Sequence, residues 1–189
     1  MRKLTSVLTI LCALAVYDFN GLICQMNIVQ GMTPTQYVND VLLGEGVTAT
    51  NVQFTGSMVQ IGYMTGGDDF SLESGLVLST DHAPNPATCG WEGGIPWGEA
   101  VSGEPDLLTV ANSVPGLIGE SFSVSSVNDV CILEFDFQPA GDFVSFNYVF
   151  GSDEYLTWIN TQYNDIFGFF LSGPGITGPY ASPAGFPDG

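Results

Sequence analysis

Two stretches in the second half of the chain alternate apolar and polar side chains and therefore predict β-strands. In residues 131–137, Cys, Leu and Phe occupy alternate positions, and Glu134 and Asp136 lie between them. Successive side chains of a strand point to opposite faces, so the apolar residues share one face. Residues 143–150 alternate in the same way, and a Pro-Ala-Gly-Asp turn connects the two stretches. A third, Phe-rich stretch at 165–171 predicts a central strand.

The first half of the chain predicts one helix followed by short strands. Thr33-Pro34-Thr35-Gln36 combines an N-cap residue, a proline at the first helical position and a Gln at the capping-box position, and Gly44 ends the helix. Short β-branched or aromatic runs at 47–54 and 58–64 are separated by Thr-Gly-Ser, which predicts a hairpin. An apolar run at 75–79 predicts a further strand.

Few strand signals occur between about residues 80 and 127. This stretch contains Asn-Pro, Gly-Gly and two tryptophans, Trp91 and Trp97, so we expect long loops that carry function or cap the fold. Several short strands with alternating faces and Gly/Pro turns favour a mainly β fold. The pattern predicts a β-sandwich of the jelly-roll or lectin-like kind with one short N-terminal helix.

The start of the chain has the pattern of a secretory signal peptide. Basic residues at positions 2 and 3 precede an apolar run that is too short to span a membrane. We expect residues 1–24 to form the signal peptide, with cleavage after Cys24 and with Ala15 as the alternative site. The sequence therefore predicts a secreted protein, and it shows no transmembrane segment.

The chain that remains divides into a domain and a tail. We expect a β-sandwich domain over residues 25–180, followed by a Gly/Pro tail at 181–189 that contains no closing strand. Because a sandwich usually finishes on a paired strand, this ending predicts that the domain is incomplete at its C-terminus.

The charge balance narrows the possible partners. The chain has 20 acidic residues, 2 basic residues and a formal net charge of −18. Asp18 lies within the expected signal peptide, so 19 carboxylates remain with no Lys or Arg. Phosphate binding needs basic side chains, which excludes a nucleic-acid partner, and a hydrophobic content of 45% excludes a disordered acidic tail. Repulsion among the carboxylates favours a divalent counterion such as Ca²⁺ outside the cell.

Acidic loops supply two candidate metal sites. The first lies where one expected strand ends and another begins, and its candidate ligands are Asp153, Glu154, Asn164 and Asp165. Oxygen ligands of this kind suit Ca²⁺. The alternative is that these residues cap turns through local backbone hydrogen bonds. A second, weaker candidate contains Asp68, Asp69 and Glu73, with the same two interpretations.

The cysteines allow one disulfide in the mature chain. Cys12 and Cys24 leave with the expected signal peptide, and Cys89 and Cys131 remain. An oxidising compartment would let these two pair across a long loop. In the alternative, Cys131 is a small buried apolar residue and Cys89 is a free thiol.

Catalytic patterns are weak. A Ser-His-Asp triad would need His82, the only histidine, and no Gly-x-Ser-x-Gly nucleophile elbow occurs. The many carboxylates keep a glycosidase pair open, but Asp153 and Glu154 are adjacent and would point apart in an extended backbone. Trp91 and Trp97 could stack on sugar rings or close the end of a sandwich.

Several long motifs, in order, resemble the choice-of-anchor L domain. The resemblance runs from about residue 27 to 180, and it rests on Gly75-Leu76-Val77-Leu78-Ser79-Thr80, Asp106-Leu107-Leu108, Leu133-Glu134-Phe135-Asp136-Phe137, Ser145-Phe146-Asn147-Tyr148-Val149-Phe150-Gly151-Ser152-Asp153-Glu154-Tyr155 and Tyr163-Asn164-Asp165-Ile166-Phe167-Gly168-Phe169-Phe170-Leu171-Ser172-Gly173-Pro174-Gly175.

The resemblance implies location more than chemistry. The family occurs in secreted bacterial surface proteins, often adhesin-like and joined to varied C-terminal anchoring signals. We therefore expect a non-enzymatic module of a cell-surface protein that acts in adhesion or surface interaction, and the charge balance adds the expectation that calcium stabilises it. Its partner would be an extracellular glycan or a surface protein, and its anchor would lie in a C-terminal region absent from this chain. The alternative is an extracellular carbohydrate-binding or glycan-hydrolysing domain.

Overall fold

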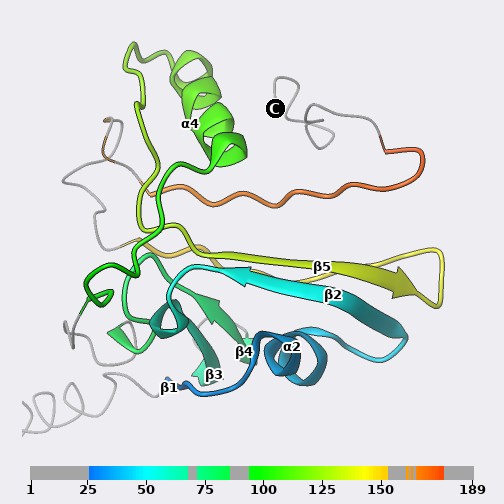
Figure 1. Ribbon diagram of the computed structural model, residues 1–189. Helices are drawn as coiled ribbons and strands as arrows, with labels where there is room; N and C mark the ends of the chain where they lie inside the picture. The colour runs from blue at the N-terminus through cyan, green and yellow to red at the C-terminus, as the bar shows by residue number, and fades with distance from the viewer. Residues whose placement is uncertain are drawn as a thin grey trace, which may run out of the picture. The chain divides into compact units, whose positions relative to one another are not determined.

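The computed structural model describes residues 26–67, 72–85, 94–152, 161, 163 and 165–176, and in them the fold is mainly antiparallel β-structure with few helices (Figure 1). The chain divides into two units. Unit 1 contains residues 1–100 and 131–145, and unit 2 contains residues 101–130 and 146–189. The signal peptide expected at 1–24 and the tail expected at 181–189 lie outside the described residues.

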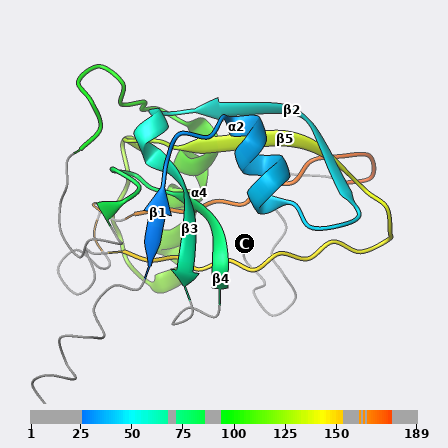
Figure 2. The same cartoon turned by 90° about the horizontal axis from the view of Figure 1, so that it is seen from below.

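Unit 1 contains two antiparallel sheets. The first has the order β1 (Asn27–Val29), β3 (Ile61–Gly67), β4 (Leu72–Leu78), and Figure 2 shows these three strands side by side. The second pairs β2 (Val47–Thr55) with β5 (Ile132–Pro139). Strand β5 coincides closely with the strand predicted from the alternation at 131–137, and β4 includes most of the predicted apolar strand at 75–79 but begins earlier, at Leu72.

A short helical segment begins where the capping pattern occurs. The α-helix α2 (Pro34–Gln36) is capped by Thr33, whose hydroxyl accepts a hydrogen bond from the Gln36 amide while the Gln36 side chain binds the Thr33 amide. The helix continues as the π-helix η1 (Tyr37–Leu42), which contacts β2 of one sheet and β3 and β4 of the other. Tyr37 and Val38 are fully buried there, so the core of unit 1 forms around this segment.

The hairpin predicted between residues 47–54 and 58–64 is wrong. The two strands belong to different sheets, because β2 pairs with β5 and β3 pairs with β1 and β4. The link between them contains the 3-10 helix η2 (Met58–Gln60), which has its own capping box between Ser57 and Gln60. The capped helical turn replaces the tight turn that a hairpin needs and sends the chain into the other sheet.

Unit 2 contains a helix where long loops were expected. Helix α4 (Pro105–Ile118) begins at Glu104, whose carboxylate accepts a hydrogen bond from the Leu107 amide, and it ends at Gly119 in the left-handed conformation. A carboxylate before a helix-initiating proline and a glycine after the last turn are ordinary helix boundaries. Pro115 lies inside the helix, in its last turns.

Two predicted strands form no ladder in the described part of the chain. Residues 143–150 and 165–171 are not strands, and neither stretch enters a described sheet. The β-sandwich stays a prediction. None of the helices that the structure describes is long and apolar enough to cross a membrane.

Candidate functional site

The site rests on a buried polar junction around η2 in unit 1. Gln60 is fully buried, its side-chain amide donates to the Ser79 carbonyl at 3.1 Å, and its own carbonyl accepts from the Ser79 amide at 2.9 Å. The Val59 carbonyl accepts from the Gln30 side chain at 2.7 Å and from the Ala83 amide at 2.8 Å. The residues that follow β1 and β4 are therefore hydrogen-bonded to the helical turn η2. These bonds hold η2 in place as a base for the surface turn at residues 96–99.

A surface turn is fastened to this base by one side chain. Ser57, only 2% exposed, donates its hydroxyl hydrogen to a carboxylate oxygen of Glu99. The Glu99 amide donates to the Pro96 carbonyl at 3.0 Å, which closes the turn, and Gly98 supplies a φ of +85°. A hydrogen bond to a carboxylate is stronger than one between neutral groups. The turn at residues 96–99 is therefore held by two bonds, a local one from the Glu99 amide to Pro96 and a distant one from Ser57 to the Glu99 carboxylate.

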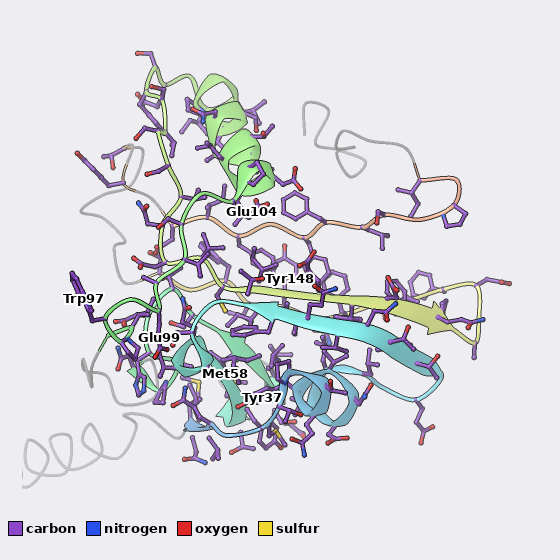
Figure 3. The ribbon with its side chains drawn as sticks, viewed as in Figure 1. Tyr37, Met58, Trp97, Glu99, Glu104 and Tyr148 are labelled. Atoms are coloured by element: carbon purple, nitrogen blue, oxygen red, sulfur yellow. The ribbon has the colours of Figure 1, made fainter. Side chains whose placement is uncertain are left out.

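Trp97 stands at the tip of this turn. Its relative exposure is 103%, and Figure 3 shows the side chain pointing away from the protein, with Glu99 on the inner side. Tryptophan is usually well buried because of its large apolar area. The hydrogen bonds of Glu99 therefore fasten the turn, and the Trp97 side chain at its tip is left fully exposed to solvent, which suits contact with a partner.

The other residues predicted for catalysis or sugar contact are only partly described. Trp91 lies outside the described residues. His82 is half-buried, and its Nδ1 atom is buried without a hydrogen-bond partner among the described residues. A triad histidine needs a carboxylate at the nitrogen that faces away from the nucleophile. In the described part of the chain, Nδ1 of His82 lacks such a partner.

Only one member of the stronger acidic site is described. The Ser152 hydroxyl donates to the Asp165 carboxylate at 2.7 Å, so the end of one extended segment meets the start of the next. Asp153, Glu154 and Asn164 lie outside the described residues, as do Asp68 and Asp69 of the weaker site, whose Glu73 is exposed on β4. The described residues contain no group of three or more potential metal ligands among His, Cys, Asp and Glu.

Cys131 lies against the same junction as the exposed turn. Its thiol donates to the Gln60 carbonyl at 3.7 Å. Burial raises the pKa of Cys131 from 9.0 to about 12, against a smaller lowering by a backbone hydrogen bond at Ser79. The group is a neutral thiol at physiological pH and a poor nucleophile. Cys89 lies outside the described residues, so their pairing stays a prediction.

Sequence reasoning missed the two carboxylate contacts that hold local structure. Glu104 could have been found from its position before a proline and an apolar stripe. The contact between Ser57 and Glu99 joins residues 42 positions apart, so no local pattern reveals it.

Comparisons with known proteins agree with the motifs. The family model of the choice-of-anchor L domain matches residues 25–189. No curated protein and no solved structure matches the chain. The choice-of-anchor L domain is a module of surface-associated bacterial proteins. Because the family match covers most of the sequence, the chain belongs to the choice-of-anchor L domain family.

Proposed function

We propose that this domain is a non-enzymatic module that acts in adhesion or surface interaction and contacts its partner through Trp97. The observation that supports this proposal is the full exposure of Trp97 on a turn fastened to the buried core by Glu99 and Ser57. The partner would be an extracellular glycan or another surface protein.

Trp97 and the turn that carries it can contribute a large share of the binding free energy. A tryptophan buries about 150–250 Å² when it is covered, and at about 25 cal/mol per Å² this gives an upper limit of about 4–6 kcal/mol. Ordering a loop on binding consumes part of such a gain. The turn at 96–99 is already held by Glu99 and by its own backbone, so ordering it on binding costs less conformational entropy. We therefore expect Trp97 to be the dominant contact.

Carbohydrate binding or hydrolysis is the second candidate. It is supported by the exposed indole of Trp97, since aromatic faces can stack on sugar rings, whereas the Glu99 carboxylate is already engaged by Ser57. Hydrolysis would further require a second carboxylate at a defined separation from the first.

A glycan array and a hydrolysis screen on the complete protein test both candidates. We expect Trp97→Ala to reduce binding to cells or glycans by at least about tenfold, as for other dominant contacts. The control is Phe143→Ala, which removes another strongly exposed aromatic ring (83%) of unit 1 and should leave binding unchanged. Equal binding by the wild type and Trp97→Ala would contradict the role of the turn. Turnover of a glycan that a single Asp or Glu substitution abolishes would replace adhesion by catalysis.

We also propose that calcium stabilises the folded chain. The net charge of −18 and the hydrogen bond between Ser152 and Asp165, which brings the flanks of the stronger acidic site together, support this proposal. A ligand that binds only the folded form adds about 2.7 kcal/mol at 100 times its Kd.

The calcium proposal is tested by thermal unfolding at matched ionic strength. Millimolar CaCl₂ should raise Tm more than NaCl does, because NaCl only screens charge. The double variant Asp153→Asn, Asp165→Asn should lose this difference. Equal Tm values in the two salts would reduce the effect to general screening.

A further inference from the structure

Two extended segments of unit 2 face each other through aromatic rings. Phe146 stacks on Phe169 with ring centroids 4.1 Å apart and 14° between the planes, and Tyr148 lies against Phe167 with centroids 5.6 Å apart. The residue two positions further along the first segment pairs with the residue two positions earlier on the second. The two segments therefore run antiparallel in a regular register. They appear as yellow and orange traces in Figure 1.

The rings form an exposed apolar surface, which we call the aromatic face. It consists of Phe146, Tyr148, Phe150, Phe167 and Phe169, which are between 43% and 63% exposed. Residues two apart on an extended segment point to the same side, so the rings of each segment share one side. Clusters of exposed aromatic residues are uncommon on proteins without a partner, since large apolar patches mark interaction sites.

The backbone of these segments also lacks partners. Among the described residues, no backbone amide or carbonyl from Phe146 to Gly151 forms a hydrogen bond, and the same holds for Ile166 to Phe169. Extended backbone with free donors and acceptors is a template for a further strand. Main-chain hydrogen bonds to such an edge provide affinity, and alternate side chains provide specificity.

Helix α4 occupies the opposite side of the second segment. A Cβ atom at Gly168 would lie 2.9 Å from Cδ2 of Leu107, a residue of α4. Because side chains alternate, Gly168 points away from the side of Phe167 and Phe169. The aromatic side is therefore the open one within unit 2.

Charge identifies the occupant. The segments 146–152 and 166–176 contain no charged residue, whereas the whole chain carries −18. Two copies of so acidic a chain repel each other on approach, and a basic partner is attracted. We propose that the aromatic face binds an extended segment of a partner protein that has apolar residues at alternate positions and Lys or Arg at its ends. This site is separate from the Trp97 turn and does not depend on its role.

A synthetic peptide tests the proposal on the complete chain. The probe alternates valine with threonine over about seven positions and carries two lysines at each end, and its counterpart carries glutamates instead. At low salt the lysine peptide should bind at least about tenfold more tightly than the glutamate peptide, and the difference should shrink in high salt. Hydrogen exchange should slow at the amides of 146–150 and 166–169 when the lysine peptide binds.

Variants locate the binding. Phe169→Ser should weaken binding of the lysine peptide by at least about tenfold. Leu117→Ser is the matched control, because Leu117 is also an exposed apolar residue of unit 2 (52%) and lies on α4. The circular dichroism spectra of both variants should match the wild type, and Tyr148→Ser provides a second test if Phe169→Ser does not fold.

Three results would overturn the proposal. The first is failure of the lysine peptide to bind or to protect these amides. The second is equal binding of the two peptides at low salt. The third is a concentration-dependent dimer of the chain alone that Phe169→Ser dissociates, since a second copy would then cover the aromatic face.

Discussion

Strand β5 and the segment at 146–150 have the same alternation of apolar and polar residues and different outcomes. In unit 1, β5 pairs with β2 along its length, and Leu133 and Phe135 are partly buried. In unit 2, Phe146, Tyr148 and Phe150 remain more than half exposed, and their backbone makes no hydrogen bond among the described residues. Alternation specifies which residues share a face, but burial requires a second element to cover that face.

The two units also differ in how they use polar side chains. Unit 1 buries Ser57 and Gln60. It joins the Ser57 hydroxyl to the Glu99 carboxylate and the Gln60 side chain to the Ser79 carbonyl. The polar side chains described in unit 2 hold mainly local or exposed contacts, such as Glu104 at the start of α4. Substitutions in unit 1 should therefore affect stability most, and substitutions on the aromatic face should affect binding.

The largest contrast is expected between Ile61→Ala and Phe169→Ala. Ile61 is fully buried, so its truncation should lower the free energy of unfolding by about 2–5 kcal/mol. Phe169 is 63% exposed, so its truncation should cost less than about 1 kcal/mol. Urea denaturation of both variants measures the difference. Similar losses would show that the aromatic face is covered in the free protein.

A second test uses the pH dependence of unit 1. The pKa of Cys131 is about 12 in the folded protein and 9.0 in the absence of burial, so the folded state keeps its proton longer than the unfolded state does. Stability from this group is present below pH 9 and declines as pH rises from 9 towards 12, by at most about 1.4 kcal/mol per pH unit.

The matched variant for this test is Cys131→Ala. It should unfold more easily than the wild type at neutral pH, because a buried atom is lost, and it should lack the additional decline above pH 9. An identical decline in both proteins would assign the alkaline sensitivity to other groups.

Ser57→Ala should have a smaller effect. The substitution removes the hydroxyl that caps η2 and that holds Glu99, with an expected loss of about 1 kcal/mol. The fluorescence of Trp97 in an otherwise tryptophan-free background should become less polarised, because the turn loses its anchor. Unchanged anisotropy would mean that the backbone bond from Glu99 to Pro96 holds the turn alone.

The smallest effect is expected for Glu104→Ala at the start of α4. Loss of this cap should destabilise unit 2 by about 0.5–1 kcal/mol, because the helix loses the acceptor for the Leu107 amide. Hydrogen exchange at the first turn of α4 gives the local reading, with unchanged exchange in β3 as the control. Faster exchange in β3 would mean that the two units unfold together.

Local patterns in the sequence predicted part of this fold. The strand at β5 followed from alternation and the start of α2 from a capping box, since both depend on residues a few positions apart. The partner of β2 could not be predicted, because another capping box at Ser57 redirects the chain and β5 lies far along the sequence. Helix α4 was missed because loops were inferred for the whole stretch from its few strand signals and its Asn-Pro and Gly-Gly pairs, which lie before the helix.

The candidate site was less accessible to sequence reasoning. Trp97 was identified as a candidate contact residue because it lies in a Gly-rich stretch, but its anchor was not. The interaction of Glu99 with Ser57 exists only after the two sheets of unit 1 have brought distant residues together. Of the candidate metal ligands, the structure describes Asp165 and Glu73. Asp165 accepts a hydrogen bond from Ser152, and Glu73 is exposed on β4.

The pairing of β2 with β5 has a consequence for how the chain folds. Thr48 lies opposite Gln138, so about half of the sequence must be synthesised between the first strand of this sheet and its partner. Loops of this length close slowly, and proteins rich in such distant pairings fold on millisecond to second timescales. During that delay β2 has an open edge that can join other chains. The strong negative charge makes unfolded chains repel one another before β2 and β5 have paired. The carboxylates that repel one another in the folded state therefore protect the folding chain from aggregation.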